Sequence, residues 1–96
     1  MFNEIIIDET KIEYVQFTIE NMQRVYDEVT SEQMNIKATH NKYGQQCLII
    51  PTSRGELICN IGDYIIRDPN SKDWSKFISC NQIMFKCLMK TFGVNI

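Results

Sequence analysis

Residues 48–67 read LIIPTSRGELICNIGDYIIR, which is three apolar runs separated by two short polar segments. Gly55 ends the first segment, where it can take the positive φ that a three-residue hairpin loop needs. Gly62 and Asp63 form the second segment, a turn-forming pair between two runs rich in β-branched residues. The pattern predicts a β-meander of three strands, and the sheet built on it should form the core.

Other strands are predicted from short apolar runs and from alternation of apolar and polar side chains. Residues 11–18 are apolar on both faces, which is typical of a strand inside a sheet. Further predicted strands lie at residues 1–7, 34–39 and 74–78, the last after a turn-rich loop at 68–73.

Two segments have the period of a helix. Residues 19–29 place apolar side chains three or four apart, with Thr18 as N-cap and an end before Thr30. Residues 80–92 form the second, with Ser79 and Gln82 as a capping box and Gly93 as the stop. The face predicted to be buried in this second helix comprises Ile83, Met84, Cys87, Leu88, Thr91 and Phe92.

These elements predict a single α+β domain over residues 1–96. Two changes of hydrophobic period bracket an alternating middle, so sequence neighbours should pair. We expect a mostly antiparallel sheet, or a partly closed barrel, of five or six strands with two covering helices.

Composition excludes several classes of function. The chain has 96 residues, with 44% hydrophobic and 23% charged residues, which is typical of a globular domain. Ten basic and twelve acidic residues give a charge of −2, which argues against a nucleic-acid partner. No apolar stretch has the length of a bilayer span, and acids stand where a secretion signal carries lysine or arginine. We therefore expect a cytoplasmic protein without a membrane partner.

The sequence predicts no catalytic site, metal site or cofactor. Cys47, Cys59, Cys80 and Cys87 contain no CxxC pair and lie in apolar runs, so four buried thiols are expected rather than disulfides or zinc. His40 is the single histidine and lies in a polar segment without a second ligand.

Asp63 is the most tempting acid, but a general acid or base needs a partner that the sequence does not supply. We expect Gly55, Gly62 and Asp63 to be structural turn residues, with the Asp63 carboxylate accepting backbone N–H groups beyond it. Trp74 either caps the core or anchors a partner, and core packing is the favoured interpretation. Met22, Met34, Met84 and Met89 are expected in the core.

The chain resembles a family of small proteins found in phage and prophage genomes. That family carries IPTxxGE, then GD[WY]II, then an aromatic residue, a cysteine and a helix that contains phenylalanine. The matching segments here are residues 11–18, 50–56 and 62–66, followed by Cys80 and Phe85. The match covers most of the chain, and the segments follow one another in the same order.

The chain also departs from the family pattern. Ile61 stands where the family has a proline before the GD pair, and a longer loop at residues 67–73 replaces a GE pair. Ser79, Asn81 and Gln82 stand at positions where the family has prolines or lysines. These changes should preserve the fold and alter any surface function of that loop.

The resemblance implies a phage accessory protein without an enzymatic activity. By analogy, we expect an inhibitor that binds a bacterial host protein in the host cytoplasm, such as a CRISPR effector or another immunity component. The expected contact residues are Tyr43, Arg54, Arg67, Asp68 and Trp74. Two alternatives remain: a small-ligand or nucleotide sponge with its pocket between helix and sheet, and a minor virion or morphogenesis protein. A homo-oligomer is also left open.

Overall fold

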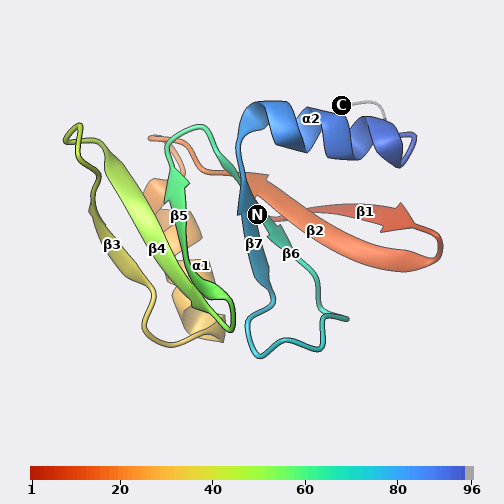
Figure 1. The fold of residues 1–96 in the computed structure, drawn as a ribbon, viewed down its shortest axis with the longest axis horizontal. Helices are drawn as coiled ribbons and strands as arrows, with labels where there is room; N and C mark the ends of the chain where they lie inside the picture. The colour runs from red at the N-terminus through yellow and green to blue at the C-terminus, as the bar shows by residue number, and fades with distance from the viewer. Residues whose placement is uncertain (95–96) are drawn as a thin grey trace.

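A computed structural model describes residues 1–94, which form seven strands and two helices (Figure 1). The helices are α1 (Met22–Glu32), between β2 and β3, and α2 (Gln82–Thr91), after β7. The strands are β1 (Asn3–Ile7), β2 (Thr10–Gln16), β3 (Lys37–His40), β4 (Gln46–Thr52), β5 (Gly55–Asn60), β6 (Tyr64–Arg67) and β7 (Phe77–Cys80).

The strands form two antiparallel sheets. Sheet A has the order β1-β2-β6-β7, and sheet B has the order β3-β4-β5. The predicted α+β class, with antiparallel pairing and two helices, is confirmed. Residues 1–94 contain seven strands, whereas five or six were expected, and the strands divide between two open sheets. The edge strands β5 and β7 lie side by side where the sheets meet (Figure 1), and the Ser79 hydroxyl donates to the carbonyl of Ile58 at 3.5 Å.

The predicted meander is correct for its first two strands and wrong for its third. β4 pairs with β5, but β6 pairs with β2 and β7 in the other sheet. The cause lies in the turn before β6, which binds the chain just after β2. Gly62 N–H donates to Phe17 O at 2.7 Å, and Phe17 N–H donates to Asp63 O at 2.8 Å. These two bonds direct the chain out of sheet B and into sheet A.

The turn between β5 and β6 has the positive φ that was predicted, with Gly62 at φ +94. Asp63 accepts the Asn60 N–H on Oδ2 at 2.9 Å, while its own N–H donates to Asn60 O at 3.0 Å. The donor therefore precedes Asp63, whereas the prediction placed it after. The carboxylate closes the turn in either case.

The loop between β4 and β5 contains two residues, Ser53 and Arg54, rather than three. Gly55 has φ +114 and already pairs with Thr52 at the end of β4. The predicted positive φ is therefore correct, and the predicted loop length is one residue too long.

Helix α1 begins three residues later than predicted and also ends later. Thr18 N–H donates to the Asn21 Oδ1 at 2.8 Å, and Asn21 N–H donates to the Thr18 hydroxyl at 3.3 Å. This pair fixes the segment before the helix, so Asn21, not Thr18, is the N-cap residue. Thr30 and Ser31 lie inside the helix, where their hydroxyls donate to the carbonyls of Tyr26 and Glu28 at 2.7 and 2.6 Å.

Helix α2 is capped by Asn81 rather than by the predicted Ser79. The Asn81 side chain accepts the Met84 N–H at 2.8 Å, while Ser79 still belongs to β7. Gly93 ends the helix as predicted, with φ +74. Its N–H donates to Lys90 O at 3.0 Å, and Val94 N–H donates to Met89 O at 2.9 Å, which is the Schellman arrangement.

The face predicted to be buried in α2 is wrong. Phe85 and Met89 are the buried residues of this helix, one turn apart, and together they make a narrow seam against sheet A. The Phe85 ring stacks on Tyr64 with centroids 3.7 Å apart. The predicted face is exposed, because α2 is apolar around most of its circumference and periodicity does not distinguish one apolar face from another. Its exposed members are Ile83, Met84, Cys87, Leu88, Thr91 and Phe92.

The buried residues form two clusters on opposite faces of sheet A. Ile65 of β6 belongs to the larger cluster, which joins α1 to both sheets, and Ile66 belongs to the smaller one beneath α2. On β2, Val15 and Tyr14 likewise face different clusters. Inner strands of sheet A are therefore covered on both sides, as was predicted for residues 11–18.

Several residues expected in the core are on the surface. Cys47 and Cys59 are buried, Cys80 is half-buried, and Cys87 is exposed; all four are free thiols. Met34 and Met84 are also exposed. Met84 and Cys87 lie on α2 and Met34 lies just after α1. Each of these helices buries only two residues, fewer than its number of apolar residues would suggest.

Candidate partner-binding site

Three of the five predicted contact residues lie in one groove, and the other two lie elsewhere. Arg54, Asp68 and Trp74 line a depression between the β4–β5 turn and the loop that connects β6 to β7. Arg67 and Tyr43 are outside it. In Figure 1 both segments reach the lower edge of the molecule, below β5 and β7.

We call this depression the loop groove. Its volume is about 710 Å³. Its lining residues are Thr52, Ser53, Arg54, Leu57, Asp68, Ser71, Lys72, Asp73, Trp74, Ser75, Lys76, Phe77 and Ile78. It therefore combines an apolar wall from β5 and β7 with a polar wall from the turn and the loop.

The β4–β5 turn and the β6–β7 loop, which together form the polar wall, are joined by a bond between Ser53 and Asp73. The Ser53 hydroxyl donates to Asp73 Oδ2 at 2.5 Å, and Asp73 Oδ1 accepts the N–H of Ser75 at 3.3 Å. The hydrogen bond from Ser53 is the main cause that holds the pKa of the Asp73 carboxyl below its ordinary value of 3.8, and Arg54 adds to it. Asp73 therefore stays ionised at neutral pH and fixes the loop to the turn.

The rest of the loop is held from within. Lys76 donates from Nζ to the carbonyls of Ser71 and of Asp73, the latter at 3.0 Å. Asp68 N–H donates to Lys76 O at 2.9 Å, closing the base of the loop. Asp68 also caps the loop through Oδ1, which accepts the N–H of Asn70 at 3.0 Å. The loop thus has a defined shape before any partner binds.

Ser75 ties the same loop to the core. It is buried, and its hydroxyl donates to Gln33 Oε1 at 2.7 Å. Gln33 follows α1 and donates from Nε2 to the carbonyl of Pro51 in β4, also at 2.7 Å. The loop, the end of α1 and β4 are joined by this chain of bonds, which rigidifies the backbone on both sides of Trp74.

Trp74 is 59% exposed although its neighbours on both sides are fixed. The structure corrects the favoured interpretation of this residue as core packing, and it corrects the strand predicted at 74–78, because β7 begins only at Phe77. Ile78, on the same groove, is exposed as well. An exposed indole on a backbone fixed at both sides, beside an exposed isoleucine, is the type of group that anchors protein interfaces.

The groove also carries two cations that have no ion-pair partner in the described part of the chain. Within residues 1–94, neither Arg54 nor Lys72 has a carboxylate within salt-bridge distance. Lys76 is occupied by the loop carbonyls, and Asp73 by Ser53. A partner surface that presents carboxylates around an apolar recess would complement this arrangement.

Arg67 has a structural environment. Its guanidinium donates to Glu13 at 2.7 Å and to Glu32, lies 3.8 Å from Glu28, and covers the Phe2 ring at 4.2 Å from the centroid. Its side chain is only 14% exposed. Burial lowers the pKa of Arg67, but the hydrogen bonds to the two carboxylates outweigh burial and raise it. Arg67 therefore joins β6, β2 and α1 rather than facing a partner.

Tyr43 lies at the other end of β4 from the groove, in the loop between β3 and β4. It is 76% exposed, and Lys42 lies 5.1 Å from the centroid of its ring. Asn41 shapes this loop, with Oδ1 accepting the N–H groups of Tyr43 and Gln45 at 2.9 and 3.1 Å. Tyr43 and Trp74 cannot belong to one small contact patch.

Sequence reasoning missed the residues that give the groove its shape. Ser53, Asp73 and Ser75 were assigned to turns or to a strand, yet they form the bonds that position Trp74. A signal was present in the segment around Trp74, which reads SKDWS. Asp and Ser on both sides of a tryptophan favour local side-chain to backbone bonds over a strand.

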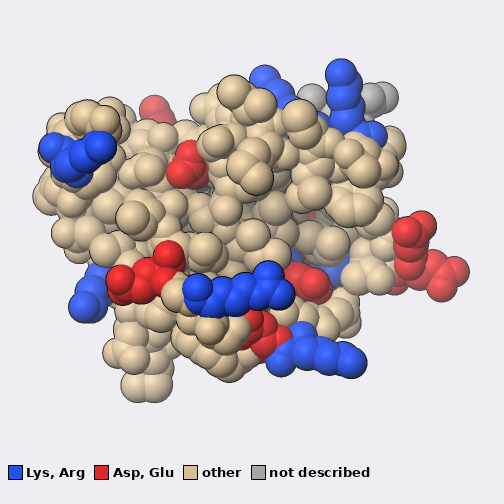
Figure 2. Space-filling view, viewed as in Figure 1, with Lys and Arg blue, Asp and Glu red and all other residues tan. Residues whose placement is uncertain are grey.

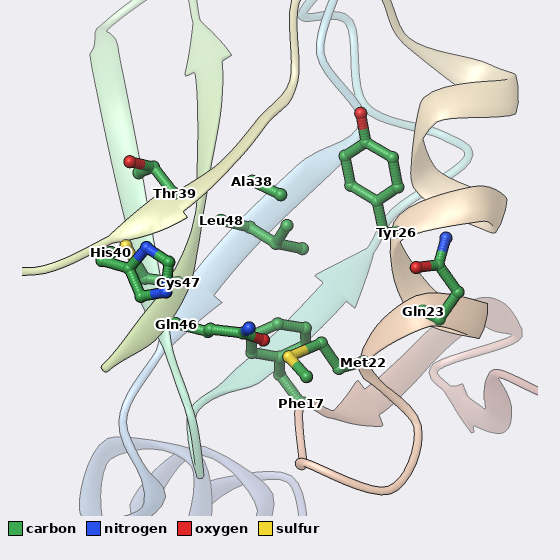
Figure 3. A pocket seen from close by; sticks show the side chains of 10 residues that line it. All are labelled: Phe17, Met22, Gln23, Tyr26, Ala38, Thr39, His40, Gln46, Cys47 and Leu48. Carbon is green, nitrogen blue, oxygen red and sulfur yellow. The ribbon is translucent and has the colours of Figure 1, made fainter. Parts of the chain in front are cut away.

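A second cavity lies between α1 and the β3–β4 hairpin (Figure 3). Its volume is about 400 Å³. The residues that line it are Phe17, Met22, Gln23, Tyr26, Ala38, Thr39, His40, Gln46, Cys47 and Leu48. None of them was predicted as a site residue.

Among the described residues, no group of three or more His, Cys, Asp and Glu side chains is placed to hold a metal ion. Neither α1 nor α2 is long and apolar enough to cross a membrane. Comparison with protein-family models, with curated proteins and with solved structures found no significant match to this chain.

Proposed function

We propose that the protein is a non-enzymatic inhibitor, encoded by a phage, that binds a bacterial immunity component through the loop groove and blocks it by covering its surface. The observation that supports binding is Trp74, an exposed indole on a loop whose backbone is fixed by Asp73 and Ser75. The phage origin and the immunity target rest on the resemblance to phage accessory proteins. A CRISPR effector in the cytoplasm of the host is the target class we favour.

Trp74 can contribute binding energy at low entropic cost. A side chain that must be ordered on binding costs about 0.5–1.5 kcal/mol, and a flexible loop costs more. Here Ser53, Ser75 and Lys76 already hold the loop. Less of the energy from burying the indole is then spent on ordering the loop.

Exposed apolar residues also lie on the elements beside the groove. Figure 2 shows few charged side chains over the upper and central part of the face that carries β7 and α2, and a band of charged side chains below it. Exposed apolar residues of these elements and of β5 are Ile58, Ile78, Ile83, Met84 and Leu88. Exposed apolar residues next to a band of charged ones are typical of protein interaction surfaces.

Affinity capture tests the proposal. The tagged protein and its Trp74→Ala and Tyr43→Ala variants would be incubated with lysates of an immune bacterial strain prepared with and without phage infection, and bound proteins identified by mass spectrometry. We expect an immunity protein to bind the parent and Tyr43→Ala but not Trp74→Ala, because Tyr43 is an exposed aromatic residue remote from the groove. Expression of the parent, but not of Trp74→Ala, should restore plaque formation by a targeted phage. Recovery of capsid or tail proteins alone would instead support a virion or morphogenesis function.

A second candidate function, small-ligand binding, is favoured by one observation. The cavity beside α1 has a volume within the range of roughly 300–1,000 Å³ that is usual for ligand pockets. Copurification of a small molecule, with a rise in melting temperature when it is added back, would support this function.

A further inference from the structure

We propose that the cavity between α1 and the β3–β4 hairpin is a binding site for a neutral planar heterocycle, of the nucleobase or nucleoside class. The proposal is independent of the loop groove, because no residue lines both cavities. It rests on the shape of the cavity walls, on side-chain polar groups that the fold does not use, and on the absence of charge among the lining residues.

The cavity exists because two elements approach each other without filling the space between them. Helix α1 packs into the core through Val25 and Val29, which are fully buried. Its adjacent face presents Met22 and Tyr26 toward β3, where Ala38 contributes only a methyl group. Figure 3 shows the Tyr26 ring across the opening from Ala38.

Apolar and aromatic groups form the floor and the sides. Phe17 and Leu48 are almost fully buried and close the bottom of the cavity. Tyr26 and Met22 supply a half-buried ring and a thioether at the side of α1. Flat rings bind well between such groups, since stacking and sulfur–aromatic contacts both favour a planar ligand.

Polar side chains at the rim of the cavity are available to form hydrogen bonds with the edge of a ligand ring. In the hydrogen bonds found within residues 1–94, the side chains of Gln46 and His40 take no part. Gln23 donates from Nε2 to Asp27 at 2.9 Å, which leaves its carbonyl oxygen as an acceptor. Figure 3 shows the Gln46 amide extending toward Phe17 and Met22. A carboxamide presents a donor beside an acceptor, which is the pattern that reads the edge of a base.

The charge of the lining residues narrows the ligand class. The lining set contains no Lys, Arg, Asp or Glu. Proteins that hold a phosphate group use arginine, lysine or a cluster of backbone N–H groups in a glycine-rich loop. A free base or a nucleoside fits the cavity better than a nucleotide, which distinguishes this site from a nucleotide sponge.

Binding of adenosine, cytidine, adenosine 5′-monophosphate and indole to the full chain tests the proposal, using ligand-observed NMR followed by titration calorimetry. At least one nucleoside should bind below about 1 mM. Ala38→Trp should fill the cavity and weaken that binding by about tenfold or more, whereas Lys37→Trp should not, because consecutive side chains of β3 point to opposite faces. Equal melting temperatures would show that both variants are folded.

A third variant tests the ring-edge contact. Gln46→Leu should weaken nucleoside binding by about tenfold and leave indole binding unchanged, since the amide pattern is lost while the apolar wall is kept. The proposal is overturned if neither nucleoside binds at about 1 mM, or if Ala38→Trp binds as well as the parent. Unchanged nucleoside affinity in Gln46→Leu, or binding of the monophosphate about tenfold tighter than adenosine, would contradict the assigned ligand class.

Discussion

The hydroxyl of Ser53 donates to the carboxylate of Asp73 at 2.5 Å, and this bond connects two segments that are 20 residues apart in the chain. It fixes the residue immediately before Trp74. The backbone on both sides of the exposed indole is thereby fixed by the bonds of Asp73 and Ser75. Because Trp74 is the single tryptophan, its fluorescence reports on this loop alone.

The loop should respond to acid through Asp73. Its folded pKa lies below the ordinary 3.8, so the bond stabilises the loop at pH above 3.8 and is lost as pH falls through the lower folded value. We expect a step in Trp74 fluorescence below pH 3.8 in the parent. In Ser53→Ala the step should move up toward 3.8, because the main cause of the shift is removed. Asp73→Asn should show no such step. Identical titrations of parent and Ser53→Ala would contradict the assignment.

Replacing Arg67 should destabilise the fold. Arg67→Met removes the bonds to Glu13 and Glu32 and leaves three carboxylates close together, so we expect a loss of about 2 kcal/mol in the free energy of unfolding. Lys11→Met is the matched control, since the pair between Lys11 and Glu4, at 3.0 Å, is exposed. Urea denaturation measures both. Equal effects of the two substitutions would show that the Arg67 network is no stronger than a surface pair.

Asp63 should act through stability alone. Asp63→Ala removes the acceptor for Asn60 N–H and should lower the free energy of unfolding by about 1 kcal/mol. Asp63→Asn keeps an acceptor oxygen and should lose less. Binding of the captured partner, measured on folded protein, should be unchanged in both variants. A variant that melts like the parent but no longer binds would identify Asp63 as a contact residue.

The four thiols should differ in reactivity. Cys87 is exposed, while burial raises the pKa of Cys59 to about 12 and also raises that of Cys80. At pH 8 we expect an aromatic disulfide reagent to modify Cys87 first and Cys59 only on unfolding, because the thiolate is the reactive form. A fast phase that persists in Cys87→Ser would contradict this order.

Local sequence signals predicted where turns and helices lie better than they predicted which strands pair and which helix face is buried. The positive φ angles of Gly55 and Gly62 follow from turn chemistry, and both are present. The departure of β6 from the meander depends on the bonds that Gly62 and Asp63 form with Phe17. Phe17 is 45 or more residues away from both, so these bonds leave no local signal in the sequence. The buried seam of α2 could not be predicted either, because apolar residues of the helix cover most of its own circumference.

The candidate site was also predictable only in part, because a sequence indicates which residues lie in loops but not which loops meet. Trp74, Arg54 and Asp68 were chosen as residues of loops, and a groove does join them. Arg67 was chosen on the same ground, but long-range pairing with Glu13 and Glu32 removes it from the surface. Which loop residues meet is decided by tertiary pairing, as the bond from Ser53 to Asp73 shows.

Site-specific photocrosslinking tests the central claim most directly. A benzophenone amino acid would replace Trp74 in one sample and Tyr43 in another, and both proteins would be irradiated in phage-infected cells of an immune bacterial strain. The expected result is one crosslinked immunity protein at position 74 and none at position 43, because only the first lies in the loop groove. Crosslinking of the same protein at position 43 but not at 74, or only of virion proteins at 74, would contradict the proposed function.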